Sequence, residues 1–229
     1  MLIFLDTETT GLQSSDKICS IAIIAQSKDV IISKYELINE GKKILPSASS
    51  IHHITNEMIK EKRDFKSSEV YKFLQNNNHQ ETTIVGHNIK FDLEKLASAG
   101  FRFKGKVVDT LRVTKHLIPE CELFSLQLLR YELKLYKNEP KDVIAHHAMG
   151  DAIVVKLLYE YLLEISSLEE MYELSFKNVL LYKLQFGKYS GKYIEEVCMS
   201  DRAYLEWMLN SISDLDEDLR YSIVYYLEG

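Results

Sequence analysis

Two acidic side chains one residue apart, Asp6 and Glu8, follow the apolar run Leu2-Ile3-Phe4-Leu5. A short run of large apolar residues is typical of a strand buried on both faces. Residues two apart in a strand point to the same side, so the two carboxylates are expected to project together from the strand end. Neighbouring carboxylates repel each other unless a cation lies between them, and Mg²⁺ prefers oxygen ligands of this kind. Two interpretations follow, a metal site or a strand-end turn with two solvated acids.

Two further acids and a pair of histidines stand at the ends of later apolar elements. Asp92 lies in the first turn of one predicted helix, and Asp151 lies on another. An acid in a first helical turn also has a purely structural use, because it interacts favourably with the helix dipole. His146 and His147 precede the last of these helices, where they have an equally plain use as capping or surface residues. The set of four acids and a histidine favours chemistry more than any member does alone.

The elements that must position these residues follow from apolar periodicity. Three strands come first and two later strands alternate with helices, which indicates an α/β fold with a mixed sheet and helices on its faces. The predicted strands span about residues 2–5, 18–25, 30–38, 82–86 and 106–108. Residues 46–50 are predicted as a loop. Helices are predicted at about 55–62, 68–75, 91–99, 109–117, from 125, 147–164, 168–174, 194–209 and 217–227.

Length and composition set outer limits. The 229 residues are enough for one full domain and a small second one, and 46% hydrophobic with 27% charged residues is an ordinary globular balance. No apolar stretch approaches the roughly 18 residues of a membrane span, and we expect no secretory signal. Three scattered cysteines favour reduced thiols and a cytoplasmic protein. A net charge of −6 argues against non-specific coating of nucleic acid, but not against a nuclease whose acids bind metal.

Three segments carry the chemical residues in a distinctive order. They read D-x-E-T-T-G at residues 6–11, H-N-x-x-F-D at 87–92 and H-x-A-x-x-D-A at 146–152. Together they resemble the three motifs of the DnaQ-like (DEDDh) 3′–5′ exonucleases, and the resemblance covers about residues 1–165. Three shorter segments resemble that family's H-G-I-T, D-T-L and S-L steps: residues 51–55, where His53 stands in place of the usual Gly, 108–111 and 125–126. The resemblance implies a ribonuclease H-like fold with a five-stranded mixed sheet.

The resemblance also implies a catalytic arrangement with two divalent metal ions, Mg²⁺ or Mn²⁺. Asp6 would bridge the ions, Glu8 and Asp151 would hold the ion that activates water, and Asp92 would complete the site directly or through water. His146 would act as the general base, because the register H-x-A-x-x-D selects it. His147 is the competing candidate.

Substrate contacts are expected near the same motifs. By resemblance, backbone amides at Thr9 and Thr10 would meet the 3′-terminal nucleotide, Leu12 would stack on its base, and Asn88 and Phe91 would line the pocket. Leu12 and Phe91 have a plain alternative use as core residues.

A second, smaller unit is expected at residues 176–229, after a first domain at 1–165 and a linker at 166–175. Its segment Phe186-Gly187-Lys188-Tyr189-Ser190-Gly191-Lys192 and the later Tyr204-Leu205-Glu206-Trp207 resemble the small C-terminal domain of exonuclease X-like proteins. An α+β unit is expected here. Lys188 and Lys192, with Lys183, are candidates for nucleic-acid contact. The alternative is a glycine-turned β-hairpin with exposed lysines, and the six basic against nine acidic residues of the unit temper the binding interpretation.

These observations predict a 3′–5′ exonuclease that removes nucleoside 5′-monophosphates from DNA 3′ ends, with single strands favoured. An RNA exonuclease of the ribonuclease T-like or oligoribonuclease-like kind is the main alternative, since the same metal site cleaves either backbone. A non-catalytic nucleic-acid-binding module is a further alternative. No membrane partner is expected. Whether the setting is DNA repair, proofreading with a polymerase or nucleic-acid turnover stays open.

Overall fold

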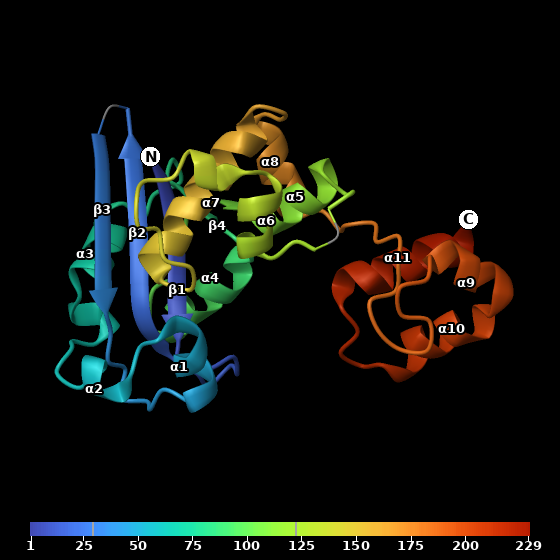
Figure 1. Ribbon diagram of the computed structural model, residues 1–229, viewed down its shortest axis with the longest axis horizontal. Helices are drawn as coiled ribbons and strands as arrows, with labels where there is room; N and C mark the ends of the chain where they lie inside the picture. The colour runs from blue at the N-terminus through green and yellow to red at the C-terminus, as the bar shows by residue number, and fades with distance from the viewer. Residues whose placement is uncertain (29, 122) are drawn as a thin grey trace. The chain divides into compact units, whose positions relative to one another are not determined.

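The computed structural model describes residues 1–28, 30–121 and 123–229, which form two compact units, Met1–Ser175 and Phe176–Gly229 (Figure 1). The segment predicted as a linker contains helix α8 (Leu168–Leu174), which packs against the last strand of the sheet and buries Met171. This segment therefore belongs to the first unit. In the described part of the chain, no helix is long and apolar enough to cross a membrane.

The first unit is built on a five-stranded mixed sheet with the strand order β3-β2-β1-β4-β5. The first three strands pair antiparallel, and β4 and β5 run parallel to β1. The predicted number, order along the chain and mixed character of the strands are confirmed. The strands are β1 (Leu2–Thr9), β2 (Ile18–Ser27), β3 (Val30–Leu37), β4 (Thr83–Gly86) and β5 (Lys106–Asp109).

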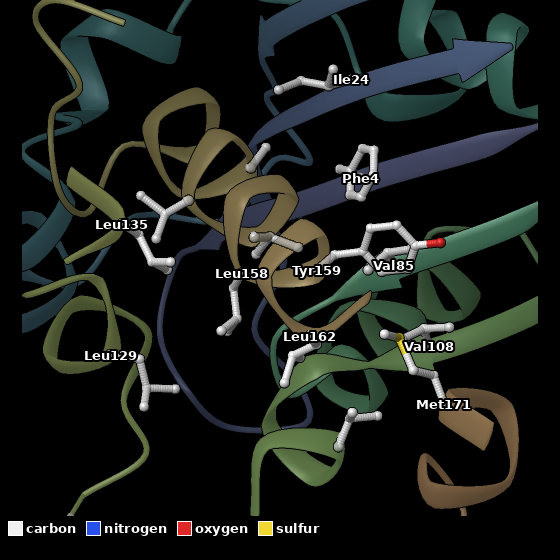
Figure 2. Close-up of a cluster of buried hydrophobic side chains, with 14 of the residues drawn as sticks. Phe4, Ile24, Val85, Val108, Leu129, Leu135, Leu158, Tyr159, Leu162 and Met171 are labelled. Carbon is white, nitrogen blue, oxygen red and sulfur yellow. The ribbon is translucent and has the colours of Figure 1, made fainter. Parts of the chain in front are cut away.

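Successive side chains of β1 enter two different cores. Phe4 packs against Tyr159 of helix α7 (Ala148–Leu163), with ring centroids 5.4 Å apart (Figure 2). Ile3 and Leu5 point to the opposite face, which is covered by α3 (Glu69–Asn76) and α4 (Ile89–Ser98). By the same alternation, the side chains two and four positions after Phe4 lie on the α7 face of the sheet, as Phe4 does.

Strand β1 continues past the end of its parallel neighbour. Its pairing with β4 ends at Phe4, opposite Val85, whereas its pairing with β2 continues to Thr9. Asp6 and Glu8 therefore lie inside β1 but beyond the end of β4, on the α7 face. Strand β1 has an antiparallel neighbour, β2, on one side and a parallel neighbour, β4, on the other. Beyond the end of β4, the side of β1 that faced it is left unpaired, and sites in such sheets often form where the strand order changes.

The predicted loop at 46–50 is wrong, because the segment forms helix α1 (Pro46–His52). Pro46 occupies the first turn, where its fixed φ suits a helix and its missing N–H costs nothing. Ala48 is buried, which gives the short helix an apolar contact. The next helix is capped by Thr55, whose Oγ1 accepts a hydrogen bond from Met58 N of α2 (Asn56–Ile59) at 3.4 Å.

Helices α5 (Thr110–Leu117) and α6 (Leu126–Glu132) and two short 3₁₀ turns, Phe65–Ser67 and Leu135–Lys137, complete the first unit. Asp109 caps α5, because its carboxylate accepts a hydrogen bond from Leu111 N at 3.0 Å.

The second unit contains α9 (Ile194–Ser200), α10 (Arg202–Ser211) and α11 (Glu217–Glu228), packed on a core of its own that includes Leu184 and Leu205. The single helix predicted at 194–209 is two helices, because Asp201 breaks the run and caps α10 by accepting from Tyr204 N at 3.3 Å. In the described residues of the second unit, β structure is limited to one isolated antiparallel bridge between Lys183 and Tyr193. The unit expected to be α+β is therefore mainly helical.

Candidate active site

Three carboxylates gather at the end of β1. Asp6 and Glu8 project from the strand onto the α7 face, and Asp151 stands in the first turn of α7. Each offers one oxygen, and these three oxygens lie within 4.8 Å of one another. The arrangement brings together residues more than 140 positions apart in the sequence, because α7 packs directly across β1. It is the coordination chemistry that a hard divalent cation requires.

The electrostatics of the cluster favour a bound cation. Burial raises the pKa of Asp6 well above its ordinary value, and the neighbouring carboxylates raise it further. Burial and then the charges of Asp151 and Asp92 raise the pKa of Glu8 to about 8. The pKa of Asp151 rises to about 6 through burial, although interactions with His146 and Gln127 oppose the rise. Without a cation these groups resist ionisation, whereas a divalent ion relieves the repulsion. The donor set therefore fits divalent metal.

Asp92 reaches the same end of β1 from α4. Its Oδ1 accepts hydrogen bonds from the Thr7 backbone N at 3.0 Å and from Thr7 Oγ1 at 2.6 Å. Burial raises its pKa to about 7, while the bonds from Thr7 lower it. Asp92 lies outside the three-oxygen cluster, but its charge raises the pKa of both Asp6 and Glu8. The structure thus brings all four predicted acids to one end of β1, with Thr7 as an unpredicted anchor for the fourth.

The two histidines before α7 differ in their surroundings. His146 is exposed, its backbone amide bonds to the Asp151 carboxylate and its charge favours the ionised form of that group. His147 is half-buried and stacks on Tyr35 of β3, with ring centroids 4.5 Å apart. His147 is therefore occupied by a structural contact, whereas His146 presents its ring to solvent next to Asp151.

Gly150 allows the segment before α7, residues 144–147, to lie close to the first turn of the helix. A Cβ atom at this position would lie 2.0 Å from the backbone oxygen of Ile144. Any side chain would push the 144–147 segment away from the helix start, and with it His146. The glycine between the histidine and Asp151 in the third motif thus has a packing reason.

A partly buried chain of polar side chains behind Asp151 was not predicted from the sequence. Gln127 of α6 donates from Nε2 to Asp151 Oδ1 at 2.5 Å. Arg130 donates to Gln127 Oε1 at 3.1 Å and pairs with both carboxylate oxygens of Glu139, at 2.6 and 2.9 Å. Partners of this kind fix the orientation of a metal-binding carboxylate. The available signal was the spacing of Gln127 and Arg130, which places both on one face of a helix.

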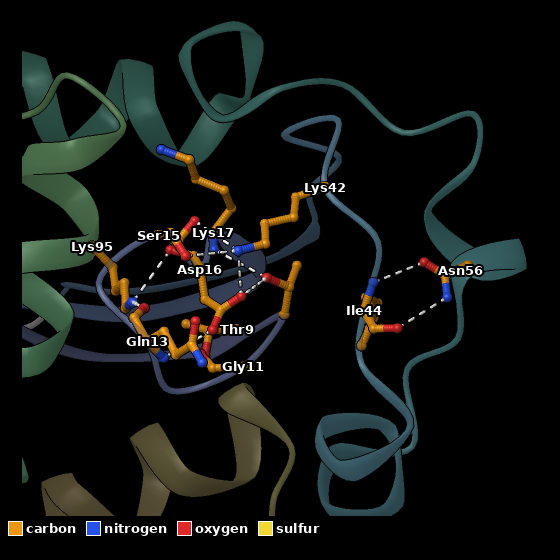
Figure 3. A network of polar contacts seen from close by, with 11 residues as sticks. Thr9, Gly11, Gln13, Ser15, Asp16, Lys17, Lys42, Ile44, Asn56 and Lys95 are labelled. Atoms are coloured by element: carbon orange, nitrogen blue, oxygen red, sulfur yellow. Dashed lines mark hydrogen bonds and ion pairs between the residues drawn. The ribbon is translucent and has the colours of Figure 1, made fainter.

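The loop after β1 is fastened by a buried acid, Asp16 (Figure 3). Its carboxylate accepts from Thr10 Oγ1 at 3.1 Å and from Gln13 N at 2.8 Å, and it pairs with Lys42 at 2.7 Å. Lys95 of α4 donates to the backbone oxygens of Gln13 and Asp16, at 2.5 and 3.2 Å. This network ties the turn after the first motif to the rest of the unit.

The same turn corrects one predicted substrate contact. The Thr10 backbone N–H donates to Lys17 O at 2.8 Å, so this amide is not available to a nucleotide. Thr9 is buried and its carbonyl accepts from His52 Nε2 at 3.2 Å. His53 follows with a φ of 60°, a left-handed conformation that explains why glycine is usual at this position.

The remaining predicted contacts differ in exposure. Leu12 is 85% exposed, so its alternative use as a core residue is wrong. Asn88 is exposed and has a left-handed backbone, held by a bond from its N–H to Asp109 Oδ1 at 3.0 Å. Phe91 is half-buried beneath Lys95 Nζ, 5.0 Å from its ring centroid. Lys188 and Lys192 are exposed on the second unit.

The histidine of the second motif is a structural residue. His87 Nε2 bonds to Phe124 O at 2.7 Å, and burial lowers its pKa to about 4. The His87 ring stays neutral, and its hydrogen bond fixes the short segment between β4 and α4. Helix α4 in turn carries Asp92.

A mixed sheet of this order, with acids from β1, α4 and α7 gathered at the end of its central strand, defines a divalent-metal hydrolase of the ribonuclease H-like class. The chain belongs to the exonuclease family: the family model described as Exonuclease (RNase_T) matches residues 3–159. A second model, described as Exodeoxyribonuclease X-like C-terminal, matches residues 184–213.

Individual relatives agree with this assignment. Exodeoxyribonuclease 10 of Escherichia coli K12 is 27% identical over 239 aligned positions that cover all of both chains. DNA polymerase III subunit epsilon of Treponema pallidum is 32% identical, over 67% of this chain and 72% of the relative. A solved structure described as "Exonuclease X in complex with 5′ overhanging duplex DNA" matches with a TM-score of 0.63 and 26% identity, over 76% of this chain and 99% of that one.

Proposed function

We propose that this chain is a 3′–5′ exodeoxyribonuclease that removes nucleoside 5′-monophosphates from DNA 3′ ends with two divalent ions, Mg²⁺ or Mn²⁺. The observation that carries the proposal is the set of three carboxylate oxygens within 4.8 Å of one another, from Asp6, Glu8 and Asp151. The names of the full-length relative and of the DNA-bound exonuclease X support DNA as the substrate.

Each residue of the site has a defined task in this reaction. Asp6, Glu8 and Asp151 would hold metal, and Asp92 would complete the site from α4. Bound divalent ions supply charge neutralisation for the phosphodiester and a water of lowered pKa. His146, exposed beside Asp151, takes the proton from the attacking water. Gln127 and Arg130 keep the Asp151 carboxylate oriented.

The 3′-terminal nucleotide is placed by side chains around the same strand end. Leu12, exposed on the turn after β1, contacts the base, and Asn88 and Phe91 at the start of α4 line the pocket. Thr9 stays in the proposal as a backbone neighbour of the nucleotide, whereas the Thr10 amide is excluded by its bond to Lys17.

Labelled oligonucleotides test the proposal directly. Matched single- and double-stranded DNA and RNA, labelled at either the 3′ or the 5′ end, are incubated with Mg²⁺, Mn²⁺ or EDTA. We expect 5′-labelled DNA to give a ladder of shortened products and 3′-labelled DNA to release mononucleotide at once, with no reaction in EDTA. The Asp6→Asn variant is the matched inactive control.

Three other outcomes would change the proposal. No degradation with either metal contradicts the enzyme assignment. Faster cleavage of RNA than of DNA moves the substrate to RNA. A ladder of shortened products from the 3′-labelled DNA, with immediate release of mononucleotide from the 5′-labelled DNA, reverses the polarity.

A further inference from the structure

We propose that the second unit carries its own binding surface for single-stranded DNA, in which bases stack on Trp207 and phosphates contact Lys183 and Lys192. The inference rests on the proposed function in one respect, namely that the ligand is the DNA on which the enzyme acts. It concerns a surface outside the carboxylate site, on a unit with a separate hydrophobic core.

The surface begins with a loop of fixed shape, residues 182–193. Leu184 is buried and its N–H donates to Lys192 O at 3.0 Å, while Gly191 N donates to Leu184 O at 2.7 Å. The bridge between Lys183 and Tyr193 closes the loop. The alternative of a glycine-turned hairpin with exposed lysines therefore describes its backbone, and the use of its side chains is a separate matter.

Asp201 organises the tip of this loop. Its Oδ2 accepts from Lys188 Nζ at 3.0 Å and from the Tyr189 hydroxyl at 2.8 Å. The Tyr204 hydroxyl accepts from Lys188 N at 3.1 Å, and it would lie 2.3 Å from a Cβ at Gly187, which has a φ of +81°. Lys188, predicted to contact nucleic acid, is thus already paired within the loop.

An aromatic row extends from the loop onto α10. Tyr189 lies edge-on to Tyr204 with centroids 5.1 Å apart, and Tyr204 lies 5.7 Å from Trp207. Trp207 is 52% exposed and Phe186, two residues from Lys188, is 45% exposed. Half-exposed rings held from behind by other rings are suited to stacking with unpaired bases.

The charges of the loop from which this row extends complement a phosphate backbone. The loop contains three lysines and no acid, and its acidic neighbour Asp201 is already engaged by Lys188 and Tyr189. Lys183 Nζ lies 4.8 Å from the centroid of the Tyr193 ring, and Lys192 is exposed. These two lysines therefore remain for phosphates, although the unit as a whole is acidic.

Single-stranded DNA is the occupant that this chemistry selects. A duplex hides the faces of its bases inside the stack, so exposed rings gain nothing from it, whereas a single strand offers both bases and phosphates. Gly191 adds room for a backbone to approach, since no atom lies within 4 Å of its Cβ position.

The chain reports on this surface by itself, because Trp207 is its single tryptophan. The full-length protein is titrated in EDTA, which prevents cleavage, with single-stranded (dT)20 and with a 20-base-pair duplex at low salt. We expect saturable quenching of the tryptophan fluorescence by (dT)20 and little quenching by the duplex. Anisotropy of labelled (dT)20 gives the affinity independently.

Variants separate stacking from charge. Trp207→Ala is expected to weaken (dT)20 binding by about tenfold, and Trp207→Phe to recover most of it. Lys183→Gln with Lys192→Gln is expected to lower the slope of log affinity against log salt by about 1.4. Tyr225→Ala, at an exposed tyrosine of α11, and the pair Lys28→Gln with Lys104→Gln, at the end of the sheet opposite the carboxylates, are matched controls.

The outcomes distinguish this inference from the proposed function. Unquenched tryptophan, or equal quenching by the duplex, overturns the binding surface even if the enzyme degrades DNA normally. Equal loss of affinity in the control variants also overturns it. Failure to degrade any DNA with Mg²⁺ or Mn²⁺ contradicts the proposed function and leaves the titration result standing. The quenching in the unaltered protein needs no substitution, so the test does not depend on whether a variant folds.

Discussion

The two units present opposite chemistry at their most distinctive surfaces. The first gathers four acids at the end of β1, where burial raises the pKa of each and the neighbouring site acids raise those of Asp6 and Glu8 further. The second displays exposed aromatic rings and exposed lysines around one loop. The acidic arrangement is unfavourable by itself and is stabilised by a bound cation. The aromatic and basic surface is stable in water without a ligand, and a ligand adds only binding energy. Loss of a residue should therefore affect turnover in the first unit and affinity in the second.

Of the substitutions that test this contrast, Asp6→Asn is expected to change DNA cleavage the most. Asp6 contributes one of the three clustered carboxylate oxygens, so its loss removes a candidate metal ligand. We expect DNA cleavage to fall by at least about 10³-fold, with (dT)20 binding to the second unit unchanged. Rates come from the ladder assay and affinities from anisotropy in EDTA. Retained cleavage, or a parallel loss of (dT)20 affinity, would break the division of labour between the units.

His146→Ala is expected to lower kcat by about 10²–10⁴-fold, the usual contribution of a positioned general base. The control is His147→Ala, which removes the contact with Tyr35 and is expected to lower stability more than turnover. The measurements are single-turnover rates at saturating metal and thermal unfolding of both variants. Near-normal turnover for His146→Ala with a loss for His147→Ala would reverse the assignment of the base.

Gln127→Ala is expected to have a smaller effect, about 10–100-fold on activity or metal affinity, because it acts through the orientation of Asp151. Saturating Mn²⁺ should recover part of this loss, as it would not if the residue only supported folding. Gln75→Ala, at an exposed position of α3, is a matched glutamine control. If Gln127→Ala has normal metal affinity and normal kcat, the buried chain from Glu139 to Asp151 serves packing alone.

The sequence predicted what depends on local pattern. Apolar runs identified all five strands, and the motif spacing identified the acids that meet at β1. It missed what depends on contacts between distant elements. Nothing adjacent in sequence links Glu139, Arg130, Gln127 and Asp151, because the connection exists only once α6 packs against α7.

Two other hydrogen-bond partners were missed for the same kind of reason. The Thr10 amide was proposed for the nucleotide, but a bond to Lys17 across the turn uses it. Lys188 was proposed for phosphate, but Asp201, thirteen residues away, engages it. In both cases, the sequence shows a group able to form hydrogen bonds, whereas its partner is set by the folding of the surrounding chain.

The smallest expected effect concerns stability, and its sign follows from the raised pKa values. The folded state holds protons on Glu8 up to about pH 8 and on Asp92 up to about pH 7, whereas the unfolded chain releases them near pH 4. Between those limits the folded state binds more protons, so the contribution of these groups to stability is present below about pH 4 and is lost as the pH rises toward 8.

A divalent ion binds the ionised carboxylates and should reverse this loss. The difference in Tm between Mn²⁺ and EDTA is therefore expected to grow from pH 5 to pH 8, by on the order of 5 °C, and to shrink in Asp6→Asn. Asp6→Asn also removes a carboxylate whose ionisation is opposed by burial and by its acidic neighbours, so its Tm in EDTA at pH 8 should exceed that of the unaltered protein. A Tm difference independent of pH would mean that the carboxylates ionise without penalty, and the contrast between a strained acidic site and a relaxed aromatic surface would then lose its physical basis.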